Sequence, residues 1–260
     1  MEDYGDIRRT HVTSTGLRKF IKSPKHFQCW LEEDQVETEA FIIGRAFHKW
    51  VLEGKEEFNK SFLVNHPDFI NSKTEKQFWF STKSYHAAYV DHGKHSIPTD
   101  DFHSMIQMDE SIRNHPIASK IISSMHSQEK IFKNPMTGRK VPCAIRVDAI
   151  SSYCTNPIIV DLKTVNDLDE FARDAIRYGY QIQAQFYLDV LSEYMAWSGV
   201  QKEPPVAMMF VCVEKDEPYR TGCFHCQPNI GGTIRQYLIE FDECVKNNRW
   251  PTRFEGLSYL

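Results

Sequence analysis

Ile159-Val160-Asp161-Leu162-Lys163 decides the fold, because it combines the apolar pattern of a buried strand with two charged residues. Side chains alternate between the two faces of a strand, so Asp161 and Lys163 point the same way, about 7 Å apart along the backbone. A carboxylate and an ammonium group on an otherwise apolar strand are costly to bury unless they are paired or used. The stretch therefore predicts a buried strand with a charged site on one face.

A second acidic residue precedes this strand, in Arg146-Val147-Asp148. Residues 128–164 read as a three-strand meander, with Asp148 near the end of one strand and Asp161 within its antiparallel neighbour. Such neighbours bring side chains within cross-strand reach. Two carboxylates that converge with a lysine suggest Mg²⁺ or Mn²⁺ and an activated water. A structural ion pair between Lys163 and either acid is the competing interpretation.

Helical periodicity surrounds this β region. Helices are expected over 7–34, 39–53, 102–124, 170–176, 178–197 and 230–247, a loop near 93–99, and further strands over 206–213 and 219–226. Strands covered by helices before, between and after them fit an α/β (α+β) fold, a central mixed β-sheet flanked by helices. Because no Pro/Gly/Ser-rich linker divides the chain, residues 1–260 are expected to form one domain, with a mainly helical part over 1–127 and a core over 128–260.

Composition limits the classes of protein that fit. No apolar run approaches eighteen residues, so no membrane span is expected. The first residues lack the order of a signal peptide, and seven cysteines without disulfide-scaffold spacing favour reduced thiols in the cytoplasm. The net charge of −4 argues against general affinity for nucleic acid. A local basic groove stays compatible with it, and residues 8–25 are locally basic.

Two pairs of residues lie four positions apart on expected helices, so each pair shares a helix face. The first pair is Gly44 and His48. A glycine inside a helix costs about 1 kcal/mol relative to alanine, which suggests a close approach at Gly44. His48 could supply a nitrogen ligand to a metal ion. The second pair is Gln183 and Tyr187.

Together these elements resemble the PD-(D/E)XK nucleases. Asp148 followed by Asp161-Leu162-Lys163 is similar to their two-strand core, although Val147 stands where the usual pattern has proline. Gly44-Arg45-Ala46-Phe47-His48 resembles the Gly-x-x-x-His element of the RecB-like branch. Gln183-Ala184-Gln185-Phe186-Tyr187 resembles its Gln-x-x-x-Tyr helix.

The resemblance narrows to phage and prophage exonucleases of the exonuclease VIII (RecE) type. Similar segments are Ser23-Pro24-Lys25-His26-Phe27, Asn134-Pro135-Met136-Thr137-Gly138, the run from Asp161 to Tyr187, and the ending from Val213 to Pro251. The likeness covers nearly the whole chain and is weakest across 65–125. It implies a single nuclease domain with a restriction-endonuclease-like core and a helical N-terminal elaboration.

The resemblance also implies roles for individual residues. The implied metal ligands are His48, Asp148, Asp161 and the backbone carbonyl of Leu162. Lys163 would activate or position the water, while Gln183 and Tyr187 would line the site and contact DNA. Arg146 could contact a phosphate, with a structural role equally open. Glu129 is a second-rank carboxylate, for which a solvated strand end is the competing interpretation.

The implied reaction is Mg²⁺-dependent hydrolysis of linear double-stranded DNA, with Mn²⁺ as a substitute. It would run processively from 5′ to 3′ and leave 3′ tails for a single-strand annealing protein of the RecT/Beta type. A homo-oligomeric ring, trimer or tetramer, would gather the basic N-terminal residues around the DNA. The expected setting is the cytoplasm of a bacterial or phage-infected cell.

Two alternatives remain open. One is a RecB-type nuclease with another role, endonucleolytic or iron–sulfur-containing, because Cys29, Cys223 and Cys226 lie in roughly suitable places. Cys244 lies far from that pair, and Cys223 and Cys226 would face opposite sides of a strand. The other alternative is a catalytically silent DNA-binding protein with the same fold.

Overall fold

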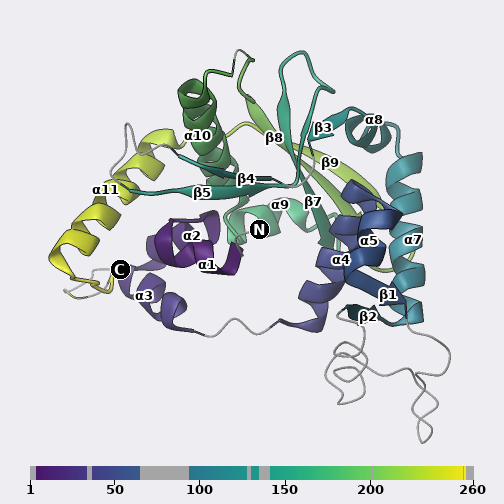
Figure 1. The fold of residues 1–260 in the computed structure, drawn as a ribbon, viewed down its shortest axis with the longest axis horizontal. Helices are drawn as coiled ribbons and strands as arrows, with labels where there is room; N and C mark the ends of the chain where they lie inside the picture. The colour runs from purple at the N-terminus through teal and green to yellow at the C-terminus, as the bar shows by residue number, and fades with distance from the viewer. Residues whose placement is uncertain are drawn as a thin grey trace, which may run out of the picture.

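The computed structural model describes residues 4–33, 37–64, 94–127, 130–134, 141–200, 202–253 and 255. Runs of helices and runs of strands follow one another along the chain (Figure 1). The helices are α1 Tyr4–Thr10, α2 Ser14–Lys22, α3 Pro24–Glu32, α4 Glu39–Glu53, α5 Lys55–Ser61, α7 Thr99–Asn114, α8 Ala118–Ser123, α9 Phe171–Arg177, α10 Tyr180–Ser198 and α11 Gly231–Asn247. The strands are β1 Phe62–Val64, β2 His95–Ile97, β3 Met125–Ser127, β4 Lys130–Lys133, β5 Ala144–Val147, β6 Ala149–Ser151, β7 Ile158–Val165, β8 Ala207–Glu214 and β9 Thr221–Cys226.

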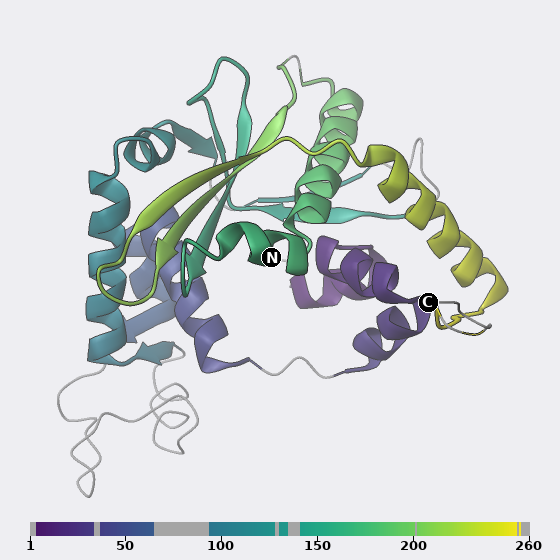
Figure 2. The same ribbon diagram turned by 180° about the vertical axis from the view of Figure 1, so that it is seen from behind.

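The main sheet has five strands in the order β3-β6-β7-β8-β9. Strands β7 and β8 run parallel, with Asp161 opposite Phe210 and Lys163 opposite Cys212, and the other pairs are antiparallel. Helices cover both faces (Figures 1 and 2). The expectation of a central mixed sheet flanked by helices is therefore confirmed.

The two faces of the sheet belong to two apolar clusters. Alternate residues of β7 face opposite ways: Ile159 packs in the cluster under α2, α3, α10 and α11, whereas Val160 and Leu162 pack in the cluster under α4, α5, α7 and α8. Asp161 and Lys163 share the face of Ile159, as alternation along a strand requires. The charged pair is thus directed toward α10, which carries Gln183.

The expected meander is wrong in one respect. The meander strand that carries Asp148 is two strands, which part at that residue: β5 pairs with β4 in a separate two-stranded sheet, and β6 pairs with β7. The break has a local cause, because the carboxylate of Asp148 accepts the amide hydrogen of Leu162 and so takes the place of a backbone acceptor. The loop expected near 93–99 also contains a strand, β2, which pairs in parallel with β1.

Side-chain caps begin two of the N-terminal helices. The hydroxyl of Thr13 accepts the amide of Gly16, and the hydroxyl of Ser23 accepts the amide of His26, with Pro24 at the first helical position. The expected helix over 102–124 appears as α7 and α8. Among the described residues, no helix has both the length and the apolar character that crossing a bilayer requires.

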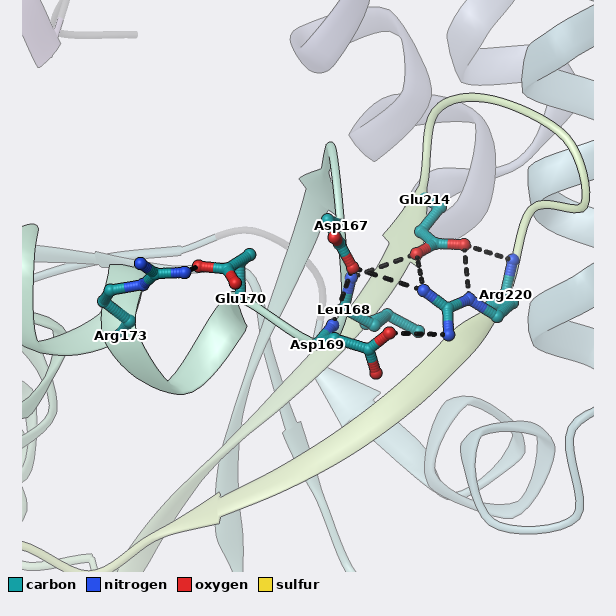
Figure 3. Close-up of polar contacts among 7 residues, drawn as sticks. All are labelled: Asp167, Leu168, Asp169, Glu170, Arg173, Glu214 and Arg220. Carbon is teal, nitrogen blue, oxygen red and sulfur yellow. Dashed lines mark hydrogen bonds and ion pairs between the residues drawn. The ribbon is translucent and has the colours of Figure 1, made fainter.

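An arginine-centred cluster fixes the loop that connects β7 to α9 (Figure 3). Arg220 binds both carboxylate oxygens of Glu214, through Nη2 at 2.6 Å and Nε at 2.9 Å. It also reaches Asp169 at 3.1 Å and Asp167 at 3.2 Å, while the amide of Leu168 donates to Glu214 at 3.0 Å. These contacts tie the end of β8 to the loop that leads toward α10.

The hydrogen bonds from Arg220 hold the pKa of Glu214 down, from its ordinary 4.5 to about 2. A carboxylate with a lowered pKa adds stability above its unfolded-state pKa, and that contribution disappears as pH falls toward 2. The substitution Glu214→Gln is expected to lower the melting temperature at pH 7 by about 3–6 °C. The difference from the native protein should narrow below pH 4.5.

Thermal melts followed by circular dichroism between pH 7 and pH 3 measure this difference. Lys246→Ala is the matched control, because it removes an exposed pair with Asp242 on α11. It should change the melting temperature by no more than about 1 °C. A gap between Glu214→Gln and the native protein that stayed constant with pH would contradict the account.

Candidate active site

A hollow of about 470 Å³ opens where α2, α4, β7, α10 and the β5–β6 junction meet. Its volume lies in the range of about 300–1,000 Å³ that is usual for ligand clefts. The hollow is lined by Ser14, Thr15, Arg18, Phe41, His48, Arg146, Asp148, Asp161, Lys163, Tyr178, Tyr180, Gln183 and Tyr187. Segments far apart in the sequence therefore contribute polar side chains to one space.

Asp148 lies in the hollow at the junction of β5 and β6. Its Oδ2 accepts the amide hydrogen of Leu162 at 3.0 Å and lies 3.4 Å from Nδ1 of His48. Burial raises the pKa of Asp148; His48 opposes that shift and the nearby Asp161 adds to it. A carboxylate kept from water beside a second acid is poised to gain from a cation.

Asp161 is held from two sides. Its Oδ1 accepts a hydrogen bond from Nε2 of Gln183 at 2.7 Å, and its Oδ2 lies 2.5 Å from Nζ of Lys163. Oδ2 is buried and has no hydrogen bond of good geometry within the described part of the chain. Burial alone lowers the pKa of Lys163, but Asp161 and Asp148 outweigh it and raise that pKa. In this arrangement Lys163 is a charged donor at neutral pH.

Tyr180 covers the lysine, a role that sequence reasoning missed. Its ring centroid lies 5.1 Å from Nζ of Lys163, and the ring stacks on Phe210 at 5.4 Å. Burial raises the pKa of the Tyr180 hydroxyl, so the group stays neutral. The ring supplies a cation–π contact that restricts the ammonium group to the side of Asp161.

Arg18 is the second residue that sequence reasoning missed as part of the site. Its Nη1 donates to the carbonyl of Tyr178 at 2.5 Å, next to Gly179, whose φ of +68° begins α10. A Cβ at Gly179 would meet Arg18 at 3.1 Å, so glycine permits this contact as well as the backbone conformation. Burial lowers the pKa of Arg18, yet a guanidinium remains charged in proteins. The sequence signal that could have indicated Arg18 was the local basic character of residues 8–25.

The other predicted residues have the following places. Gly44 and His48 lie on one face of α4, and Gln183 and Tyr187 lie on one face of α10, where both are buried. Arg146, at the end of β5, lines the hollow beside Asp148. Leu162 contributes its amide, while the role of its carbonyl stays a prediction. Glu129 lies outside the described residues, as does all but Asn134 of the expected turn Asn134-Pro135-Met136-Thr137-Gly138.

The side chains of the site are of types that bind a divalent cation, but they are not arranged as a complete coordination sphere. Within the described ranges, no three His, Cys, Asp or Glu side chains are arranged as a metal cluster. Asp161 faces Lys163 and Gln183, whereas His48 faces Asp148. The two carboxylates match the preference of Mg²⁺ and Mn²⁺ for oxygen ligands, and the imidazole of His48 is a nitrogen ligand that Mn²⁺ accepts.

The cysteines do not support an iron–sulfur cluster. On β9, Cys223 packs against the cluster under α7 while Cys226 packs against the cluster under α10, so they face opposite sides of the sheet. Cys244 is buried in α11, and Cys29 is exposed on α3. The described cysteines therefore do not converge on one point.

A mixed sheet that brings Asp148 and Asp-x-Lys together defines a domain of the PD-(D/E)XK type. Residues 13–260 match the family described as PDDEXK-like domain of unknown function (DUF3799). The chain belongs to this family. A comparison with curated proteins found no match.

Solved structures agree with this fold. A protein from Eubacterium rectale, described as a "putative exonuclease", superposes with a TM-score of 0.61 over 99% of this chain and 92% of its own. The two sequences are 12% identical, so the similarity concerns the fold alone. The protein SSO0001 is 14% identical with a TM-score of 0.34, over 79% of this chain and 85% of its own, and it carries no argument.

The hydrogen bond from Gln183 to Asp161 is expected to matter for stability as well as for the site. The substitution Gln183→Leu leaves a buried carboxylate oxygen without its donor and should lower the free energy of unfolding by about 1–3 kcal/mol. Urea denaturation measures the change. Gln181→Leu, two positions earlier and exposed on the same helix, should stay within about 0.5 kcal/mol of the native protein. Equal effects of the two substitutions would contradict the assigned contact.

Proposed function

We propose that the protein is a metal-dependent exodeoxyribonuclease that hydrolyses linear double-stranded DNA from 5′ to 3′ and leaves 3′ single-stranded tails. One observation carries the proposal: Asp148, Asp161 and Lys163 meet in one hollow, with the carboxylate of Asp148 bound to the strand that carries the other two. The nuclease class has further support from the PDDEXK-like family and from the fold of the Eubacterium rectale protein. Polarity and end preference rest on the resemblance to exonucleases of the RecE type.

The residues divide the chemistry among themselves. Asp148, Asp161 and His48 would hold a divalent cation, usual in PD-(D/E)XK nucleases, which supplies Lewis acidity to offset charge on the phosphodiester and to acidify water. Lys163 donates from the side of Asp161 and stabilises the negative charge that develops as the phosphodiester is attacked. Gln183 keeps Asp161 turned toward the centre of the site.

Positive charge near the carboxylates gives the phosphate backbone a place to bind. Arg18 lines the hollow on the α2 side, and Arg146 lines it beside Asp148. Ser14 and Thr15, in the first turn of α2, add hydroxyl groups near Arg18. Phosphate contacts of this kind position a substrate without reading its sequence. A chain with a net charge of −4 can therefore bind DNA through this hollow.

The decisive experiment compares linear with closed-circular duplex DNA in Mg²⁺, with one strand labelled at a time. We expect the linear DNA to be degraded, the 5′ label to be released first, and the circle to persist. EDTA should stop the reaction and Mn²⁺ should restore it. Cutting of the circle would indicate an endonuclease instead.

Variants in the same assay test the assigned residues. Asp161→Ala and Lys163→Ala should reduce degradation by at least about 10³-fold and leave DNA binding largely intact. Lys215→Ala and Asp216→Ala, exposed at the β8–β9 turn, are matched controls with activity close to native. Binding without degradation by the native protein would favour the catalytically silent alternative.

The proposal also includes a ring-shaped homo-oligomer, trimer or tetramer, and a single-strand annealing partner of the RecT/Beta type. A ring would place several copies of the basic helix α2 around one duplex. Light scattering under the conditions of the digestion assay measures the assembly. A monomer that degrades DNA processively would contradict the ring.

A further inference from the structure

We propose that the face of α4 carrying Gly44 is a track for the sugar–phosphate backbone of the DNA strand that is being cut. The track continues the active-site hollow along the helix. This inference rests on the proposed function, because it names where the same strand runs on either side of the reacting phosphate. It gives a role to Gly44, which has none in binding a metal ion.

The track is a second hollow, of about 290 Å³, that borders the active-site hollow. Phe41, His48 and Arg146 line both hollows, so the two share a border. The remaining lining residues of the track are Ala40, Gly44, Arg45, Lys49, Leu52 and Glu53. A strand whose phosphate lies beside Asp148 and His48 would continue over α4 across this shared border.

Gly44 lies on the surface of α4 that lines the track. A Cβ placed there would meet no heavy atom of the described residues within 4 Å, so internal packing does not require glycine. The residue lies inside the fifteen-residue helix α4 with helical neighbours on both sides, where alanine is the better helix former. Glycine thus weakens the helix at a position where the fold has room for a side chain. A ligand that approaches the helix backbone explains this cost.

The charged side chains along the track indicate the class of ligand. Arg45, Lys49 and Arg146 line the track, against a single carboxylate, Glu53. Lys49 pairs with Glu53 at 3.0 Å on the same helix, and Arg45 pairs with Glu37 at 2.6 Å. Acids therefore hold Arg45 and Lys49 in place and offset part of their charge, while Arg146 adds positive charge where the track borders the active-site hollow. A polyanion with regularly spaced charges fits this arrangement, as electrostatic contacts dominate DNA binding.

Spacing along the helix agrees with a strand that passes over it. Gly44 and His48 are one turn apart, about 6 Å along the axis. The distance between successive phosphates of one strand is comparable, so a phosphate near His48 would place the neighbouring phosphate over Gly44. A side chain at position 44 would then push the strand away from the helix and shift the reacting phosphate.

The test uses Gly44→Ala and Gly44→Met in the full chain. Both residues favour helix, so the melting temperature should stay equal to the native value or rise. In the nuclease assay, KM for linear duplex should rise about tenfold for Gly44→Ala and more for Gly44→Met. Fluorescence anisotropy with an end-labelled duplex in EDTA should show a parallel loss of affinity. Gly232→Ala is the matched control, since this glycine is also helical and open, on α11.

The outcomes separate the track from the nuclease activity. If the native protein degrades DNA while both Gly44 variants keep its KM and affinity, the track is refuted and the nuclease stands. If the native protein binds DNA without cutting it and the Gly44 variants bind less, the track is supported and the nuclease is refuted. A lower melting temperature for Gly44→Ala would also overturn the inference, because the glycine would then serve internal packing.

Discussion

The hydrogen bond between the carboxylate of Asp148 and the amide of Leu162 is the contact on which the site depends. It substitutes a side chain for a backbone acceptor where two short strands part. A hydrogen bond to a charged acceptor contributes about 1.5–3 kcal/mol. That free energy holds Asp148 beside β7 at the point where the strand carries Asp161 and Lys163. The same contact turns β5 away from the main sheet, so Arg146 reaches the mouth of the hollow.

The separation of two apolar clusters by the sheet explains why the charged residues can stay together. Leu162 anchors β7 in the cluster under α7, while Asp161 and Lys163 face α10. Each charge has a partner on that side: Gln183 and Lys163 for Asp161, and the ring of Tyr180 for Lys163. Asp161 and Lys163 can be buried because each of them lies beside a group that stabilises its charge. The cost that remains is at Asp148, whose pKa is raised by burial and which a bound cation would stabilise in its charged form.

The sequence was sufficient to predict features that depend on local periodicity. Features that depend on contacts between distant residues were not predicted. Alternation along β7 and four-residue spacing on α4 and α10 were sufficient to place Asp161, His48 and Gln183 on the correct elements. The break at Asp148 left no signal, since apolar alternation continues through 144–150. Arg18 meets the carbonyl of Tyr178 across most of the chain, and its basic neighbourhood did not distinguish it from a solvated face.

The parallel pairing of β7 with β8 has a consequence for biosynthesis. Strand β7 already contains both charged residues, but its neighbour β8 is translated only after α9 and α10. Parallel strands joined by such a crossover pair late, because a long loop must close before their contacts form. On the ribosome, a nascent chain that ended before β8 would leave the backbone of β7 unpaired along one edge. The sheet that carries Asp161 and Lys163 can therefore be completed only when most of the polypeptide has emerged from the ribosome.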